Sequence, residues 1–147
     1  MTAENFLEQY GDITAKIRRK QRLKENLEAQ TLNVTSHLTP DKVQSSGSLQ
    51  KIAEAVEEAL DLEVEIKELF PLKNKVRKEI ESVLDRVSFK RAEVLHAKYL
   101  LLKSKEDIML LVDRSETTVD KWIKEGKEEV QCILDTRCSE ITENTAK

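Results

Sequence analysis

Five hydroxyl and ammonium side chains gather near the start of a helical stretch: Ser115, Thr117, Thr118, Lys121 and Lys124. Hydroxyl groups can hydrogen-bond to phosphate oxygens, and ammonium groups neutralise their charge. The apolar residues between them keep helical spacing and leave these polar groups outward. Because the N-terminus of a helix also attracts phosphate, the stretch is a candidate contact with a nucleic acid.

Two shorter helical segments must position these groups. Ser88 opens the first, and apolar residues at helical spacing follow it to Leu102. Ser104, with Asp107 three residues later, resembles a capping box and opens a helix of about eight residues. A turn of about three residues then leads to Ser115, which is expected to cap the last helix. This layout is that of a helix-turn-helix, whose last helix lies in the major groove of DNA.

The charge of residues 88–127 leaves the kind of partner open. The segment has nine Lys and Arg against seven Asp and Glu, a net charge of +2. Glu116 and Asp120 can accept a hydrogen bond from cytosine, but they also repel phosphates. DNA binding therefore competes with a second interpretation, a small helical module that binds a protein. The charge of the face carrying Arg114, Lys121 and Lys124 separates the two.

Three short motifs connect this segment with a known family. "LHAKY" (95–99) matches an L-x-x-R-Y segment that ends a helix, "EDIM" (106–109) matches an EEIA-type helix start, and Ser115, Thr118 and Val119 match an S-x-x-T-V segment. In these motifs residues 91–134 resemble region four of bacterial sigma factors. They are more closely similar to sigma-like regulators of Gram-positive phages and integrated elements, including phage late-gene transcription activators. Such proteins typically join a long helical half to this module.

The resemblance implies a module that contacts promoter DNA and RNA polymerase together. The positions it implies for base contacts are Glu116, Thr117, Asp120 and Lys121. The positions it implies for backbone contacts are near Arg114, Ser115 and Lys124. The chain departs from the family's pattern at Leu102 and Asp113, where the family usually has Gly, and at Met109, where it has a small Ala. Asp can still occupy a left-handed turn position.

The N-terminal part predicts two long helices. Residues 3–33 keep apolar side chains at steps of three and four, which predicts one helix with Thr2 as its cap. Residues 34–48 include Pro40 and four serines and predict a loop. Ser48 is then expected to cap a second helix.

The second helix carries a repeat of 3.5 residues. Ten of the eleven positions that alternate steps of three and four from Ile52 to Val87 are apolar. Such a repeat is typical of a coiled-coil seam. Pro71 keeps this phase, so we expect a kink rather than a helix end. The positions expected to form an oligomer or partner interface are Ile52, Ala59, Leu62, Ile66, Leu69, Val76 and Ile80.

A basic stretch interrupts the apolar phase of the first helix. Residues 16–24, "KIRRKQRLK", hold six positive charges, with Lys20 and Lys24 in the seam phase. They form either a solvated face near a weak point of the seam or a contact for nucleic acid or an acidic partner.

Composition and spacing narrow the remaining classes of function. The 147 residues carry a net charge of −3, with 36% charged and 4% aromatic residues, which suits long exposed helices. Cys132 and Cys138 have no redox or zinc spacing, and no Gly-rich phosphate loop is present. The carboxylates of the second helix lack the Glu-x-x-His pairs of metal sites in helical bundles. We therefore expect no enzyme, no cofactor and no metal.

The same sequence predicts a protein of a reducing cytosol. The N-terminus lacks the basic start and apolar run of a signal peptide. No apolar stretch approaches the roughly 18 residues that a membrane span needs. We expect a bacterial cytoplasmic protein that associates with the nucleoid and not with a membrane.

These observations predict an all-α fold. Residues 1–87 would form an antiparallel coiled-coil hairpin, 88–134 a helix-turn-helix module and 135–147 a flexible tail. The leading hypothesis is a DNA-binding transcriptional regulator of a phage or integrated element that self-associates or contacts RNA polymerase through its helical arm. The rival is a coiled-coil protein-interaction adaptor without DNA binding, and a third idea is a ring-forming subunit of phage DNA packaging.

Overall fold

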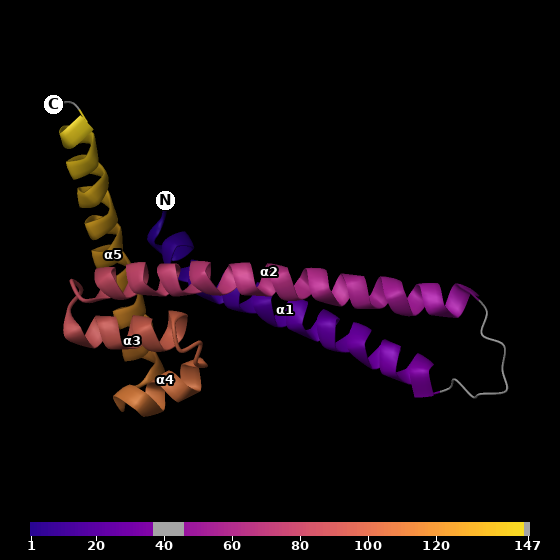
Figure 1. The fold of residues 1–147 in the computed structure, drawn as a ribbon. Coiled ribbons are helices and arrows are strands. Elements are labelled where there is room, and N and C mark those ends of the chain that lie inside the picture. Colours follow the sequence, from indigo (N-terminus) through magenta and orange to yellow (C-terminus); the bar gives the residue numbers. More distant parts are fainter. Residues whose placement is uncertain (37–45, 146–147) are drawn as a thin grey trace. The chain divides into compact units, whose positions relative to one another are not determined.

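The computed structural model describes residues 1–36 and 46–145, with side chains for residues 1–32 and 49–137. This part of the chain is all-α, as the sequence predicts, and contains no strand. Figure 1 shows its helices, which are α1 (Ala3–Ser36), α2 (Ser46–Leu84), α3 (Phe89–Tyr99), α4 (Lys105–Val112) and α5 (Glu116–Thr145).

The long helices extend further than the sequence pattern predicts. α1 continues to Ser36 and α2 begins at Ser46, so both enter the predicted loop 34–48. The rest of that loop lies outside the described residues. Ser48 is therefore inside α2, and the expectation that it caps this helix is wrong. α5 continues to Thr145, through residues where the sequence predicts a tail.

The starts of the other helices test three predicted caps. Thr2 Oγ1 accepts the N–H of Asn5 at 3.2 Å, which confirms the cap of α1. Ser104 Oγ accepts the N–H three residues later at 3.3 Å, which confirms the cap of α4. Ser88 occupies the N-cap position of α3, but its hydroxyl makes no capping bond and donates to a carboxylate of α5. Ser88 is therefore the N-cap residue of α3 by position, as the sequence predicts, but without a side-chain capping bond.

The chain divides into two compact units, which are described separately. Unit 1 comprises Met1–Asp12 and Lys73–Lys147, and unit 2 comprises Ile13–Leu72. The sequence pattern groups all of residues 1–87 in one arm, whereas the structure assigns the start of α1 and the end of α2 to the unit that holds α3, α4 and α5. Burial supports this grouping, because Leu7 and Ile80 are fully buried.

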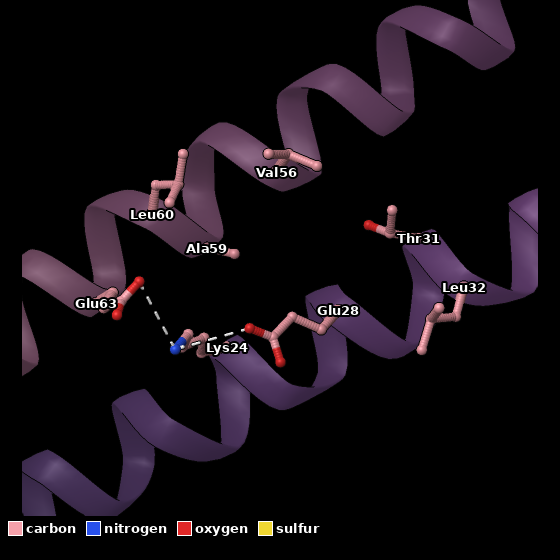
Figure 2. Close-up of a pocket in the computed structure, with 8 residues that line it drawn as sticks. All are labelled: Lys24, Glu28, Thr31, Leu32, Val56, Ala59, Leu60 and Glu63. Carbon is pink, nitrogen blue, oxygen red and sulfur yellow. Dashed lines mark ion pairs between the residues drawn. The ribbon is translucent and has the colours of Figure 1, made fainter.

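In unit 2, ion pairs connect α1 with α2. Lys20 Nζ lies 2.6 Å from Glu65 Oε2, and Lys24 Nζ lies 4.0 Å from Glu63 Oε2. Figure 2 shows Lys24 between Glu63 and Glu28, the latter one turn along its own helix. The lysines that interrupt the apolar phase of α1 therefore pair with α2. Because the residue number falls on one helix as it rises on the other, α1 and α2 are antiparallel here.

The predicted interface positions of α2 are covered within the single chain. Four of them are buried and three are half-buried. The buried ones are Ala59, Ile66, Val76 and Ile80, and the half-buried ones are Ile52, Leu62 and Leu69. A contact with another chain through these side chains would require them to separate from their present neighbours, so other residues are better placed for it.

In unit 1, α3 packs against α4 and α5, and α4 packs against α5. The fully buried side chains of this unit come from every helix of the described chain. They are Leu7, Ile80, Val83, Val94, Leu95, Ile108, Val119 and Val130. α5 approaches α3 closely at Gly126, where an added Cβ would lie 2.8 Å from Leu95 Cδ1.

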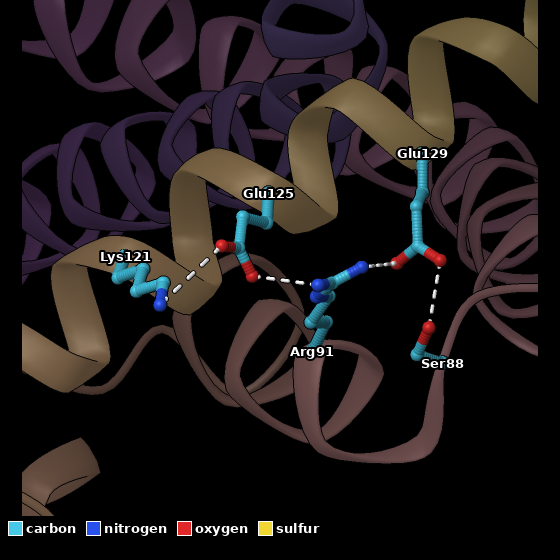
Figure 3. Close-up of polar contacts among 5 residues, drawn as sticks. All are labelled: Ser88, Arg91, Lys121, Glu125 and Glu129. Atoms are coloured by element: carbon cyan, nitrogen blue, oxygen red, sulfur yellow. Dashed lines mark hydrogen bonds and ion pairs between the residues drawn. The ribbon is translucent and has the colours of Figure 1, made fainter.

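A polar cluster fixes α5 on α3 beside this core. Arg91 of α3 lies between two carboxylates of α5, with Nη2 2.7 Å from Glu125 Oε2 and Nη1 3.3 Å from Glu129 Oε2. Ser88 Oγ donates to Glu129 Oε1 at 2.7 Å, as Figure 3 shows. Partial burial acts to raise the pKa of Glu129, but the hydrogen bond from Ser88 and the pair with Arg91 outweigh it and hold that pKa below its usual value.

Within residues 1–36 and 46–145, two residues other than glycine have a left-handed backbone. Leu102, between α3 and α4, has φ 54°, and Asp113, between α4 and α5, has φ 52°. The expectation that Asp113 occupies a left-handed turn position is confirmed. This conformation costs an L-residue roughly 1–2 kcal/mol, and only glycine adopts it freely.

Replacing Leu102 with Gly should therefore stabilise the protein. We expect the free energy of unfolding to rise by about 1 kcal/mol, because relief of backbone strain exceeds the entropy that glycine adds to the unfolded chain. Urea unfolding measures this change. Leu101→Gly is the matched control, since Leu101 is also exposed but has no positive φ. Equal destabilisation of both variants would contradict the assigned strain.

Replacing Glu129 with Gln should destabilise the protein in a pH-dependent way. The folded-state pKa of Glu129 is lowered, so its stabilisation is present above the unfolded-state value of about 4.3 and lost as the pH falls through the folded-state pKa. We expect a loss of up to about 1 kcal/mol at pH 7 that shrinks as the pH falls below the unfolded-state value and vanishes once the carboxyl is protonated in the folded state. Denaturant unfolding across this range tests it, with the exposed Glu128→Gln as control. A loss that does not change with pH would contradict the assignment.

Candidate nucleic-acid interface

The segment singled out by the sequence forms α4, a three-residue turn and the start of α5. The N–H of Asp113 donates to Met109 O, and the N–H of Arg114 donates to the same oxygen at 3.2 Å, which ends α4. At the start of α5, the N–H of Val119 donates to Ser115 O at 3.0 Å. The hydroxyls of Ser115 and its partner Thr118 lie 3.2 Å apart.

The predicted contact residues lie together on the outside of this segment. All but one are exposed, and Thr118 is half-buried. The exposed ones are Arg114, Ser115, Glu116, Thr117, Asp120, Lys121 and Lys124.

The buried stripe of α5 determines which of these side chains share a face. Val119 and Val130 are fully excluded from solvent, and Ile123 is 8% exposed. With 3.6 residues per turn, the opposite side of the helix holds Thr117, Lys121 and Lys124, which are spaced by four and three residues.

The two carboxylates near the start of α5 are turned to one side. Lys105, the first residue of α4, has its Nζ 3.0 Å from Asp120 Oδ1 and 3.3 Å from Glu116 Oε1. The hydrogen bonds with Asp120 and then Glu116 raise the pKa of Lys105 above its ordinary value. The ammonium group therefore offsets part of the negative charge that Glu116 and Asp120 bring to the segment.

Sequence reasoning missed this role of Lys105. Its partners lie 11 and 15 positions away, too far along the chain for a contact within one helix or strand, and only the packing of α4 on α5 brings them together. The same holds for Arg91, whose carboxylate partners come from another helix. A charge inventory by segment cannot detect such pairs.

The cations of the outward face differ in the contacts that they make. Lys121 Nζ lies 3.9 Å from Glu125 Oε1, a long ion pair of a side chain that is itself 70% exposed. Arg114 donates from Nη1 to the neighbouring Asp113 O at 3.3 Å. Lys124 has no ion pair with any side chain that the structure describes. These three cations remain accessible to an anionic partner.

The basic stretch of α1 belongs to unit 2 and divides into two groups. Lys20 and Lys24 pair with α2, as described above. The other four cations are exposed and have no ion pair among the described side chains: Lys16, Arg18, Arg19 and Arg22. Both sequence interpretations of this stretch, a solvated face and a contact for an anionic partner, stay open for these four.

Within the described residues, no three His, Cys, Asp or Glu side chains come together in a way that could hold a metal ion. Of the helices in that part of the chain, none combines the length and apolar character required to cross a membrane.

Because comparison with known proteins gives no match, the function is inferred from the geometry. Neither a protein-family model, nor a curated protein, nor a solved structure matches this chain.

Proposed function

We propose that the chain is a DNA-binding transcriptional regulator of a phage or integrated element, related to region four of sigma factors. In this proposal α3, α4 and α5 form a helix-turn-helix, and α5 enters the major groove of duplex DNA. Arg114, Ser115 and Lys124 contact the phosphate backbone, and Thr117 and Lys121 face the bases. Phosphate contacts provide most of the affinity and make it sensitive to salt.

The observation that carries the proposal is the pairing of Lys105 with Glu116 and Asp120. These carboxylates were the main argument against DNA, because they would repel phosphates. Because Glu116 and Asp120 are held toward α4, the outward face of α5 carries Thr117, Lys121 and Lys124.

The backbone gives a second line of support. Leu102 and Asp113 have left-handed φ values of 54° and 52°. These are the two positions where the sigma-like regulators usually carry Gly. The chain thus adopts a conformation that suits glycine at both places, although it has another residue there.

One feature favours a protein partner for the same unit. On α4, Leu110 is 81% exposed and Leu111 is 54% exposed. Exposed apolar side chains side by side on one helix suit contact with another protein. RNA polymerase, which the resemblance implies, is the partner we propose for this surface. A protein-interaction adaptor without DNA binding is the alternative function.

Reversing the charge of the outward face should abolish DNA binding. For Lys121→Glu with Lys124→Glu, we expect affinity for duplex fragments of the encoding locus to fall at least tenfold, about what the loss of two phosphate contacts implies. The slope of log affinity against log salt should fall by about 2. Fluorescence anisotropy at several salt concentrations measures both. Lys75→Glu with Lys78→Glu, exposed on α2 of the same unit, is the control of equal charge. Equal binding by both double variants would favour the adaptor.

Removing Lys105 should weaken DNA binding indirectly. Lys105→Gln releases Glu116 and Asp120, and we expect a loss of roughly threefold to tenfold, the size of one charged contact at a surface. Combining it with Glu116→Gln and Asp120→Asn should restore the affinity. Lys103→Gln, exposed and outside the cluster, should have little effect. If the triple variant stays as weak as Lys105→Gln, Lys105 itself contacts DNA and the assigned role is wrong.

A further inference from the structure

Charge is divided along the helices of unit 2. Because α1 and α2 are antiparallel, residues 13–24 lie beside 62–72 and form a basic half, and residues 25–32 lie beside 49–61 and form an acidic half. The basic half has seven basic and three acidic side chains, a net charge of +4. The acidic half has one basic and six acidic side chains, a net charge of −5. Unit 2 is therefore strongly dipolar.

An apolar ridge crosses the boundary between the two halves. Val56, Leu60 and Val64 are 42%, 55% and 56% exposed, and their spacing of four residues places them on one side of α2. Figure 2 shows Val56 and Leu60 at the edge of a groove between α1 and α2, which Leu32 borders from the other helix. Leu60 is the centre of the ridge and lies next to the charge boundary. Within the chain this ridge is only partly covered.

We propose that this ridge and the divided charge form the interface of a homodimer, in which two copies of unit 2 pack antiparallel about a twofold axis near Leu60. Such an axis places Val56 of one copy opposite Val64 of the other and Leu60 opposite its own equivalent. It also places the basic half of each copy against the acidic half of its partner. A twofold interface must be complementary to itself, and this surface is.

Other kinds of binding partner match less of this surface than a second copy does. A nucleic acid fits the exposed cations Arg18 and Arg22 but not the acidic half or the apolar ridge. A partner with a single sign of charge likewise matches only one half. A second copy of unit 2 would cover the ridge and pair both charged halves at once. This inference does not depend on the proposed DNA binding, because it concerns unit 2 alone.

The interface differs from the one that the sequence pattern predicts. That pattern selects the seam of α2, which is already covered within the chain. The ridge at Val56, Leu60 and Val64 lies beside the seam on the same helix, offset so that α1 covers it only in part. Dimerisation would thus add a second pair of helices to the first without separating α1 from α2.

The first test is the mass of the full chain. Sedimentation equilibrium at low salt should give twice the mass of one chain at high micromolar concentration. Dissociation should increase with salt, because screening weakens the pairing of the two halves. Leu60→Asp should raise the dissociation constant by roughly a hundredfold, since it sets two carboxylates against each other at the axis. A wild-type monomer at this concentration would overturn the proposal.

Charge reversal gives the sharper test. Variant A carries Arg18→Glu and Arg22→Glu, and variant B carries Glu57→Lys and Asp61→Lys, all four residues being exposed and outside the ion pairs of unit 2. Each variant alone should be monomeric, with circular dichroism showing that its helices remain. An equal mixture of A and B should form a heterodimer, because each mutated half then meets its complement.

Three outcomes would overturn the proposal. Variants that still dimerise alone would place the interface elsewhere. A mixture that stays monomeric would exclude pairing of the two halves. A monomeric wild type in which variant A, but not variant B, loses DNA affinity would assign the basic half to nucleic acid instead. Lys75→Glu with Lys78→Glu, which changes the net charge as variant A does but lies in unit 1, should dimerise like the wild type.

Discussion

The burial of one apolar stripe orients α5 and so decides what its other faces can contact. Val119, Ile123 and Val130 lie against the core of unit 1, and Gly126 allows α3 to approach closely. Burying each such side chain contributes roughly 1.5–3 kcal/mol, whereas an exposed ion pair contributes about 1 kcal/mol or less. The apolar stripe therefore fixes the rotation of α5, and the charged side chains adjust to it. Thr117, Lys121 and Lys124 face outward as a consequence.

Within that constraint, ion pairs between helices sort the charges of the chain. Lys105 draws Glu116 and Asp120 toward α4, and Arg91 holds two further carboxylates of α5 against α3. The chain has a net charge of −3, yet its carboxylates are unevenly available because many of those in unit 1 are engaged inside the unit. In unit 2 the opposite holds, since most of the acidic side chains of α2 remain outward. The two units therefore offer surfaces of different character.

The sequence predicted what depends on local pattern. The all-α class, the cap at Thr2 and the left-handed turn at Asp113 follow from spacing and from the conformations that single residues prefer. The ends of α1, α2 and α5 were predicted too short, because serines and threonines that often end helices are tolerated inside these. Ser88 lies at the N-cap position of α3 as predicted, but its hydroxyl makes no capping bond because it donates to a tertiary partner, Glu129.

What the sequence could not predict depends on contacts between distant residues. The grouping of the first turns of α1 with α3, α4 and α5 has no sequence signal, since the buried Phe6 fits the seam pattern as well as it fits a core. The role of Lys105 likewise requires α4 and α5 to be packed together. The residues of the candidate site therefore follow from its motif, whereas the arrangement that leaves them accessible depends on the packing of α4 on α5.

We propose that the outward face of α5 contacts duplex DNA. Backbone amide chemical shifts of the labelled full chain, recorded while a promoter fragment of its own locus is added, test it most directly. We expect the amides of residues 114–124 to shift most and the shifts to reverse as salt is raised. Shifts confined to unit 2, or none at low salt while the protein remains folded, would contradict it.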